Sequence, residues 1–345
     1  MNKSKISIVI PCYNAADSIY TTWGSIKRQT YGIENIEAIF VDDASTDDGA
    51  TLSKLMEIEQ EAPQSVIVIP SEKNGGPGGA VNSGIEYASG DYLQIVGADD
   101  ELADDAMEKL YAIAVENDTD IIQYNHTLIL NGNRKVNMVS VGNKLICIDD
   151  HDSRISFLNA TSVTYGCTNK FYKMDLIRST GVKFAENVVY EEPLFVYPLF
   201  LYAKRVYFYE EGLYYYYLHP NSIVTSKIGK KILDHPKVQL MVLADCMNRT
   251  ELYEEYKDVI ACYFLWSYYC ETLFFAVENP DSILPLNYFT EMQNVCKKLF
   301  PDWRDNPQIR RTSKETIQLL ESIDKTFTTQ NELDKFIHEV KELGF

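Results

Sequence analysis

The chain has 345 residues, enough for one large domain or two ordinary ones, and 46% of them are hydrophobic, which is too many for a disordered protein. Its 32 basic and 50 acidic residues give a formal charge of −18. Such an acidic surface argues against general nucleic-acid binding and against simple electrostatic docking on an anionic membrane.

Strand and helix patterns alternate through the first 125 residues. Short apolar runs predict strands at 6–10, 37–41, 65–69, 91–96 and 121–124. Apolar residues at helical spacing predict helices at 18–29, with Asp17 as the N-cap, and at 48–61, 79–88 and 103–116. This alternation predicts an α/β fold with a doubly wound, mostly parallel sheet, whose ligands bind at the carboxyl ends of the strands.

The pattern changes after residue 125. Residues 127–130 and 136–141 flank Asn131-Gly132-Asn133, which predicts a hairpin. A helix at 191–202 and extended segments at 205–209 and 213–218 are expected next.

From about residue 228 the sequence is mainly helical, so we divide the chain into a domain at 1–226 and a helical C-terminal region at 227–345. The most apolar stretch of that region is 259–277. Because it contains Glu271 and several tyrosines, we interpret it as a buried or amphipathic helix rather than a membrane span.

Two aspartate pairs, Asp42-Asp43 and Asp99-Asp100, follow the second and fourth predicted strands. Both pairs would point into the same crevice of the sheet, where close carboxylates repel one another unless positive charge lies between them. Mg²⁺ and Mn²⁺ prefer oxygen ligands, often carboxylates together with substrate phosphates. The pairs therefore favour a metal–nucleotide site, and solvated turns or helix caps are the alternative.

A glycine-rich loop, Lys73-Asn74-Gly75-Gly76-Pro77-Gly78-Gly79, leads from the third strand into a helix. Glycines let backbone amides approach a phosphate, and a helix N-terminus favours an anion. The loop is not a dinucleotide-binding fingerprint, because it follows the third strand and Val81 stands where the last glycine belongs. A plain turn is an equal alternative.

Taken together and in order, these segments resemble the family 2 glycosyltransferases, which have the GT-A fold. The resemblance spans roughly residues 4–226 and leaves the helical tail uncovered. It rests on Ile10-Pro11-Cys12-Tyr13-Asn14, Val41-Asp42-Asp43-Ala44-Ser45-Thr46-Asp47-Asp48-Gly49, Asn74-Gly75-Gly76 with Ala80-Val81-Asn82-Ser83-Gly84 and Ala88-Ser89-Gly90-Asp91-Tyr92, Ala98-Asp99-Asp100, Asn169-Lys170-Phe171-Tyr172, Tyr190-Glu191-Glu192-Pro193-Leu194-Phe195 and Tyr217-Leu218-His219-Pro220-Asn221-Ser222-Ile223.

The resemblance implies transfer of a sugar from a nucleotide-diphosphate donor to an acceptor hydroxyl. Tyr13 would stack on the base and Asp43 would accept its ring N–H, which favours a UDP-sugar. Pro11 would help to hold the nucleoside, and further donor contacts are expected at Asn14 and Asn74. Candidates for phosphate contact are Lys73, Lys170 and His219, and for each of them an exposed surface charge is the alternative.

The acidic motif implied by the resemblance would bind Mn²⁺ or Mg²⁺. Asp100 is the first choice as direct ligand and Asp99 as a sugar or ribose contact. The ion would stabilise the departing diphosphate.

Glu191-Glu192 occupies the position where the family usually carries Glu-Asp. Glu192 would be the general base that takes the acceptor proton during a single in-line displacement, which inverts the anomeric configuration. The alternative is that both acids only open the following helix, where negative charge and Pro193 are both favourable.

Three positions depart from the family pattern. Gly97 replaces the first Asp of the metal motif, Val81 replaces a common Arg, and the base is Glu rather than Asp. The first two motivate an alternative, a catalytically degenerate sugar-nucleotide-binding scaffold. A nucleotidyltransferase is another alternative, although it needs a glycine-rich signature where Pro11 to Asn14 stand.

The resemblance implies a glycan or lipid-linked acceptor in bacterial cell-surface polysaccharide synthesis. Seven scattered cysteines without a Cys-x-x-Cys pair, and a first apolar run that stops at Pro11, favour a cytoplasmic protein, including one peripheral at the inner face of the membrane. The aromatic stretch at 263–275 motivates two hypotheses for the tail, a homodimer face and peripheral membrane contact.

Overall fold

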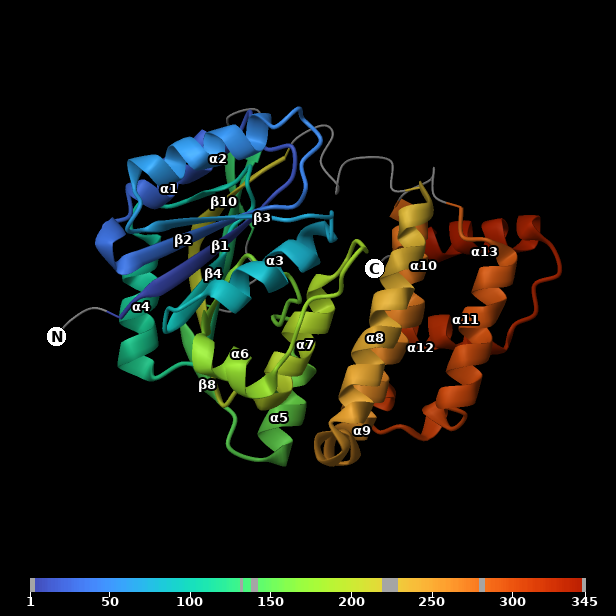
Figure 1. Cartoon of the computed structure of the whole chain (residues 1–345). Helices are drawn as coiled ribbons and strands as arrows, with labels where there is room; N and C mark the ends of the chain where they lie inside the picture. Colours follow the sequence, from blue (N-terminus) through green and yellow to red (C-terminus); the bar gives the residue numbers. More distant parts are fainter. Residues whose placement is uncertain (1–3, 131–132, 138–141, 219–228, 279–282, 343–345) are drawn as a thin grey trace. The chain divides into compact units, whose positions relative to one another are not determined.

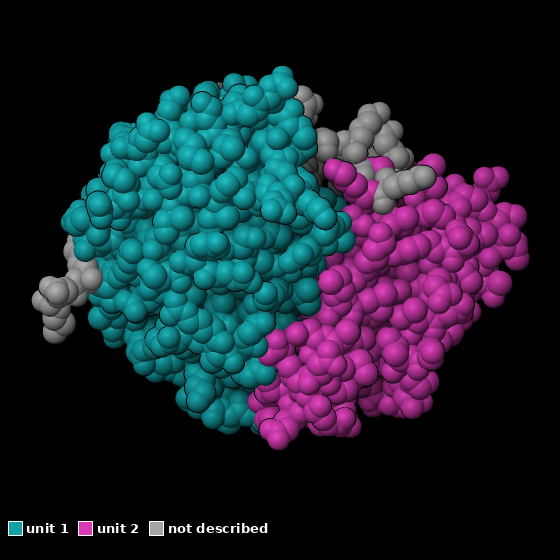
Figure 2. Space-filling view, viewed as in Figure 1, with its two compact units in different colours: residues 1–219 teal, residues 220–345 magenta. Residues whose placement is uncertain are grey.

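The computed structural model describes residues 4–130, 133–137, 142–218, 229–278 and 283–342. The chain divides into two compact units, Met1–His219 and Pro220–Phe345, which Figure 2 distinguishes by colour. The predicted boundary at 226 falls in 219–228, outside the described residues.

The described residues of the first unit form a ten-stranded sheet, which Figure 1 shows in outline. Its strand order is β3-β2-β1-β4-β9-β6-β10-β5, with β7 beside β6 and β8 beside β10. The strands are β1 (Ile6–Cys12), β2 (Ile36–Asp42), β3 (Val66–Pro70), β4 (Tyr92–Ile95), β5 (Glu101–Leu102), β6 (Ile121–Leu130), β7 (Asn133–Asn137), β8 (Lys144–Cys147), β9 (Lys170–Lys173) and β10 (Arg205–Tyr217).

The first four strands are mutually parallel, and β1 and β2 are buried almost throughout, as expected for a sheet covered on both faces. Figure 1 shows α1 and α2 together over one face of these strands and α3 over the other. The alternation of strands and helices predicted here is confirmed. The helices are α1 (Ile19–Lys27), α2 (Ala50–Glu61), α3 (Gly76–Tyr87) and α4 (Ala106–Asn117).

The predicted cap of the first helix was wrong by one residue. Ser18, not Asp17, is the N-cap of α1, and its hydroxyl donates to the carbonyl of Ala98 (2.8 Å) instead of capping the helix. This bond ties the start of α1 to the acidic motif that follows β4.

The other half of the sheet is mixed, so the expectation of a mostly parallel sheet holds only for β1 to β4. β9 is antiparallel to both β4 and β6, whereas β10 is parallel to β6. β9 has only four residues, which is too short for an alternation of apolar and polar residues to be recognised in the sequence. The two extended segments predicted at 205–209 and 213–218 are one strand, β10, whose register shifts around Gly212 produce the break in the pattern.

The predicted hairpin is confirmed as an antiparallel pair of β6 and β7, with its turn at 131–132 outside the described residues. The predicted helix at 191–202 is α7 (Glu192–Tyr202), in which the seven residues from Phe195 to Leu201 are buried. Two further helices are α5 (His151–Leu158) and α6 (Met174–Thr180).

The second unit is helical, as predicted. One continuous helical segment, Thr250–Glu278, is long and apolar enough to cross a membrane (mean hydropathy 1.3), but 72% of its most apolar window is buried in the protein. That burial agrees with the interpretation of 259–277 as a buried helix. The segments are α8 (Asp234–Asn248), α9 (Thr250–Phe264), a π-helical stretch (Leu265–Glu271), α10 (Thr272–Glu278), α11 (Leu286–Leu299), α12 (Lys314–Glu321) and α13 (Gln330–Glu342).

Candidate active site

The carboxyl ends of β1, β2 and β4 meet at one edge of the sheet. Cys12 pairs with Asp42, and Val9 pairs with Ile95, so the residues that follow these strands leave the sheet together. Pro11 is still part of β1, one residue before this edge. The predicted nucleoside contacts and the acidic motif therefore start from adjacent strands.

The loops after β1 and β2 brace each other. Asn14, in the left-handed backbone region (φ 51°), donates its N–H to the Ser45 hydroxyl (2.9 Å) and accepts the Thr46 N–H on its side chain (2.8 Å). Asn14 thus shapes the loop. Tyr13 is 48% exposed, with its hydroxyl 3.3 Å from the Thr46 hydroxyl, which leaves an aromatic ring at the edge of the sheet.

Asp43 fastens the glycine-rich loop to the sheet. Its Oδ1 accepts the Gly75 N–H (2.8 Å), and its backbone carbonyl accepts from the Asn74 side-chain amide (3.0 Å). Burial raises the pKa of Asp43, and the N–H groups of Gly75 and Gly76 oppose that shift. A carboxylate has about four acceptor sites, so these bonds leave capacity for a base N–H.

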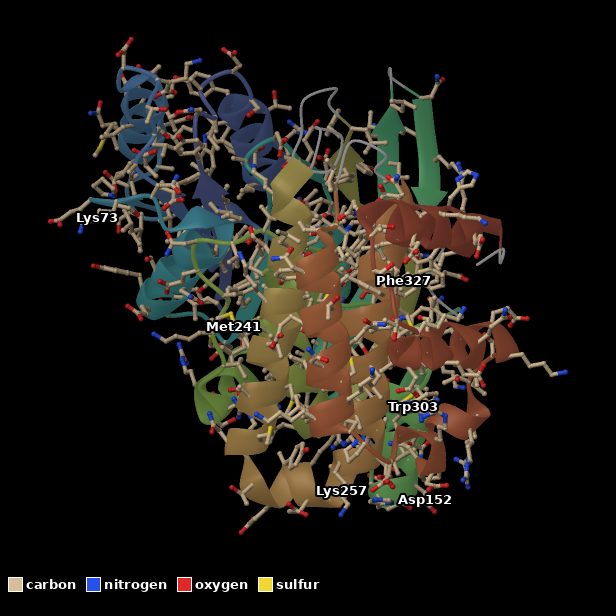
Figure 3. All side chains as sticks on the ribbon, turned by 90° about the vertical axis from the view of Figure 1, so that its right-hand side faces the viewer. Lys73, Asp152, Met241, Lys257, Trp303 and Phe327 are labelled. Atoms are coloured by element: carbon tan, nitrogen blue, oxygen red, sulfur yellow. The ribbon has the colours of Figure 1, made fainter. Side chains whose placement is uncertain are left out.

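The glycines of this loop admit another backbone segment, residues 184–188. A Cβ at Gly78 would overlap the carbonyl oxygen of Ala185, and Asn187 N–H donates to the Gly75 carbonyl (2.7 Å). This close approach explains Gly78 without a phosphate, and the left-handed backbone of Gly76 (φ 74°) explains a second glycine of the loop. Lys73 is exposed, and in Figure 3 its side chain extends outward into solvent.

The two aspartates of the acidic motif face different surroundings. Asp100 is 4% exposed, its Oδ2 accepts from the Tyr214 hydroxyl (2.5 Å), and its Oδ1 accepts from the Tyr217 N–H (2.9 Å). Burial raises the pKa of Asp100 to about 7, and the charge of Asp99 adds to the shift. Asp99 is exposed. We therefore shift our expectation for the direct metal ligand from Asp100 to Asp99.

Gly97 is required by the same arrangement. Its N–H donates to the Tyr214 hydroxyl (2.9 Å), and a Cβ at this position would lie 2.8 Å from Asp100 Oδ2 and 3.3 Å from that hydroxyl. The space that an aspartate side chain would enter is thus bounded by carboxylate oxygens of Asp100 and Asp99 and by the Tyr214 hydroxyl. The departure from the family pattern at Gly97 has a structural reason.

The donor set fits an ion that is shared with a substrate. Within the described residues, no group of three or more His, Cys, Asp and Glu side chains could hold a metal alone. Mg²⁺ and Mn²⁺ sites of nucleotide enzymes commonly use one or two carboxylates and complete the shell with phosphates and water. Asp99, exposed beside Asp100, fits that kind of site.

The second acidic pair begins α7. Tyr190, just before it, has a left-handed backbone (φ 65°), a conformation that costs free energy and that surrounding contacts must hold. Glu192 Oε1 accepts the Cys167 N–H (2.7 Å). Burial, followed by the charge of Glu192, raises the pKa of Glu191 to about 8.

Lys170 is not a phosphate contact in this structure. It is fully buried, and its ammonium donates to the Gly166 carbonyl, Asn169 Oδ1 and Thr164 Oγ1, which use its three hydrogens. The alternative of an exposed surface charge was also wrong. His219 lies outside the described residues.

Tyr216 of β10 links the two acidic pairs. Burial raises its pKa to about 12, and the carboxylates of Asp100, Asp99 and Glu192 all contribute in that order. One half-buried hydroxyl therefore lies within electrostatic reach of the predicted metal motif and of the predicted base.

Tyr214 and Tyr216 were not among the predicted site residues. They belong to a run of four tyrosines in β10, and residues two apart in a strand share a face. This alternation could have pointed to Tyr214 and Tyr216 as site residues, because the run of tyrosines leads into the motif of the resemblance that contains His219. The backbone N–H of Cys167, which donates to Glu192, could not be predicted as part of the site from the sequence.

A family model described as "Glycosyl transferase family 2" matches residues 7–181. The chain belongs to this family. The membership decides against a nucleotidyltransferase. It also agrees with the placement of Tyr13, Asp43, Asp99 and Asp100 at one edge of the sheet.

Several family members are similar over much of the chain. The uncharacterized glycosyltransferase YibD of Escherichia coli is 27% identical over 266 residues, 75% of this chain and 74% of that protein. The poly(ribitol-phosphate) beta-glucosyltransferase of Bacillus spizizenii is 31% identical over 218 residues, 61% of this chain but 32% of that protein. The chain thus corresponds to about a third of the Bacillus enzyme.

A solved structure confirms the GT-A fold. Residues 1–349 of Staphylococcus aureus TarS, in complex with UDP-GlcNAc, superpose with a TM-score of 0.72 at 19% identity. The match covers 99% of this chain and 92% of that one, so it includes the helical region that the motifs left uncovered.

Proposed function

We propose that the chain is an inverting glycosyltransferase that transfers a sugar from a UDP-sugar to a glycan or lipid-linked acceptor hydroxyl in cell-surface polysaccharide synthesis. The observation that carries the proposal is the match of residues 7–181 to the family model, together with the position of Tyr13, Asp43 and Asp99 after neighbouring strands of the sheet. Asp100, Asp99 and Glu192 all contribute to the raised pKa of Tyr216, which supports a donor motif and a base that serve one site. Relatives whose names describe poly(ribitol-phosphate) glycosyl transfer support the acceptor class.

The donor end of the site would use the residues after β1, β2 and β4. The exposed ring of Tyr13 would stack on uracil, and Asp43 would accept its ring N–H. Asp99 would hold Mn²⁺ or Mg²⁺ together with the diphosphate, and the ion would supply positive charge for the departing UDP.

In the transfer step, Glu192 accepts the proton of the acceptor hydroxyl. The acceptor oxygen forms a bond to the anomeric carbon as the bond from that carbon to the phosphate oxygen breaks, and its electron pair leaves with UDP. Attack opposite the leaving group inverts the anomeric configuration. A fixed general base of this kind contributes roughly 10²- to 10⁴-fold.

Calorimetric titration with UDP, with Mn²⁺ and with EDTA, tests the donor half. We expect metal-dependent binding to the wild type that Asp99→Asn loses, whereas Asp152→Asn, a change of an exposed aspartate on α5, leaves it unchanged. No binding of UDP, GDP or dTDP by the wild type would contradict the proposal. Release of UDP from UDP-glucose or UDP-GlcNAc then distinguishes an enzyme from a binding scaffold.

A further inference from the structure

Lys170 on β9 is a buried cation that the proposed reaction does not use. Its ammonium donates to the Gly166 carbonyl (2.5 Å), Asn169 Oδ1 (3.1 Å) and Thr164 Oγ1 (3.2 Å). All three acceptors are formally neutral and belong to the loop before β9. Because a buried charge is costly unless it is paired and hydrogen-bonded, this loop alone does not account for a lysine here.

The loop connects Lys170 to the proposed base. The peptide unit between Gly166 and Cys167 has its carbonyl oxygen on the Lys170 ammonium, and its N–H donates to Glu192 Oε1 (2.7 Å). Hydrogen bonds at the two ends of one peptide group polarise each other and strengthen together. A continuous chain therefore runs from ammonium to peptide to carboxylate.

The electrostatic surroundings agree with this connection. Burial lowers the pKa of Lys170 to about 7, and the Glu192 charge opposes that shift. Burial and Glu192 together raise the pKa of the Cys167 thiol and of the Tyr172 hydroxyl on β9 well above their ordinary values.

Two further described groups face the Glu192 carboxylate. Tyr216 on β10 has its pKa raised to about 12, and the adjacent Glu191 has its pKa raised to about 8. These described groups around Glu192 are thus neutral or acidic apart from Lys170. Among them, Lys170 is the one that can carry a positive charge.

We propose that Lys170 is a positioning residue for the general base. Acting through the Gly166–Cys167 peptide, it fixes Glu192 Oε1 and favours the ionised carboxylate, which leaves Oε2 to take the acceptor proton. Being fully buried, Lys170 does not touch the substrate. The inference rests on the proposed role of Glu192 as base.

A double-mutant cycle tests the inference. UDP release from UDP-glucose and UDP-GlcNAc, with water as acceptor, is measured for wild type, Lys170→Met, Glu192→Gln and the double variant. We expect Lys170→Met to lower kcat at least about 30-fold with the UDP dissociation constant within about threefold, and to change kcat less than about threefold in the Glu192→Gln background.

Lys173→Met is the matched control, because Lys173 lies on the same strand and pairs with the exposed Asp118 (2.8 Å). It should leave kcat unchanged. The same loss of kcat from Lys170→Met in both backgrounds would overturn the inference, as would loss of UDP binding together with kcat in both Lys170→Met and Lys170→Gln. Wild-type turnover by Glu192→Gln would instead refute the base assignment itself.

The pH dependence of kcat separates positioning from simple support of the loop. Removing a neighbouring positive charge disfavours an ionised carboxylate, so the low-pH limb of Lys170→Met should move to higher pH. Lys170→Gln keeps a hydrogen-bond donor without the charge and should move the limb in the same direction, which covers a Met variant that fails to bind UDP. A limb that stays at the wild-type pH in both variants would overturn the inference.

Discussion

The acidic pair after β4 and the acidic pair that begins α7 are alike in sequence, but the fold separates the two members of each. In the first pair, Asp100 is buried with both oxygens bonded to tyrosine donors, whereas Asp99 is exposed. In the second pair, Glu192 is fixed by a backbone N–H, whereas burial raises the pKa of Glu191 to about 8.

The difference within each pair has a common physical reason. Two adjacent carboxylates repel each other, and environments that separate their ionisation assign them separate roles. We infer that Asp100 and Glu191 support the site and that Asp99 and Glu192 act on the substrates. This division of roles can be tested by substitutions of one member of a pair, or of a residue whose contact makes the surroundings of the two members different.

The largest effect is expected from Glu192→Gln. The amide still accepts the Cys167 N–H but cannot take a proton, so kcat should fall by about 10²- to 10⁴-fold. UDP affinity should stay within about threefold, because the base lies on the acceptor side. A steady-state assay of UDP release and a calorimetric titration measure the two quantities, and a variant that retains more than a tenth of wild-type kcat would contradict the assignment.

Asp99→Asn and Asp100→Asn should differ in kind. Asp99→Asn should weaken UDP binding in Mn²⁺ by about 10- to 100-fold, which corresponds to roughly 1.4–2.8 kcal/mol, and EDTA should abolish the difference from wild type. Asp100→Asn replaces a buried carboxyl group that accepts two hydrogen bonds. It should lower the free energy of unfolding by about 1–3 kcal/mol. If Asp100→Asn weakened UDP binding and Asp99→Asn lowered stability instead, Asp100 would be the direct metal ligand.

Gly97→Ala tests the close packing of Gly97 against Asp100, the buried member of the first acidic pair. The added Cβ would lie 2.8 Å from Asp100 Oδ2, so we expect a loss of about 1–3 kcal/mol in the free energy of unfolding, measured by denaturant titration. Gly24→Ala in α1 is the control. Its Cβ would meet the tip of the Arg28 side chain at 3.2 Å, and helix propensity should make it neutral or stabilising by up to about 1 kcal/mol. Equal losses would show that Gly97 has no special role.

Glu191→Gln should have the smallest effect on activity at neutral pH, within about threefold in kcat, because the amide resembles a protonated carboxyl. Its effect on stability should depend on pH. A carboxyl whose pKa is raised on folding stabilises the protein at low pH and loses that contribution as pH rises toward about 8. Glu191→Gln should therefore match wild type near pH 4 and exceed its free energy of unfolding increasingly as the pH rises, by up to roughly 5 kcal/mol above pH 8. Parallel stability curves would contradict the raised pKa.

Much of the donor half of the site could be predicted from the sequence. Parallel strands bring their carboxyl ends to one edge, so the order of strands along the chain is enough to group Asp43, Asp99 and Tyr13. Their roles as ligands stay predictions. The residues that support them could not be grouped in this way, because Tyr214 reaches Asp100 from 114 positions further along the chain.

The residues whose surroundings could not be predicted from the sequence share a physical cause. Lys170 looked like a candidate phosphate contact because a lysine is seldom fully buried, and only the three acceptors around its ammonium explain why it is. Asp100 was the first choice as metal ligand because the sequence does not show that both of its oxygens accept hydrogen bonds, and which aspartate binds the ion stays a prediction. The antiparallel β9, four residues long and flanked by strands distant in sequence, was likewise invisible to a periodicity argument.

The most direct test of the division of roles is the kcat of Glu191→Gln beside that of Glu192→Gln, at pH 7 with saturating UDP-sugar and Mn²⁺. The account predicts that the two adjacent substitutions differ by at least about 100-fold, with Glu191→Gln close to wild type. Equal losses, or a larger loss in Glu191→Gln, would contradict it.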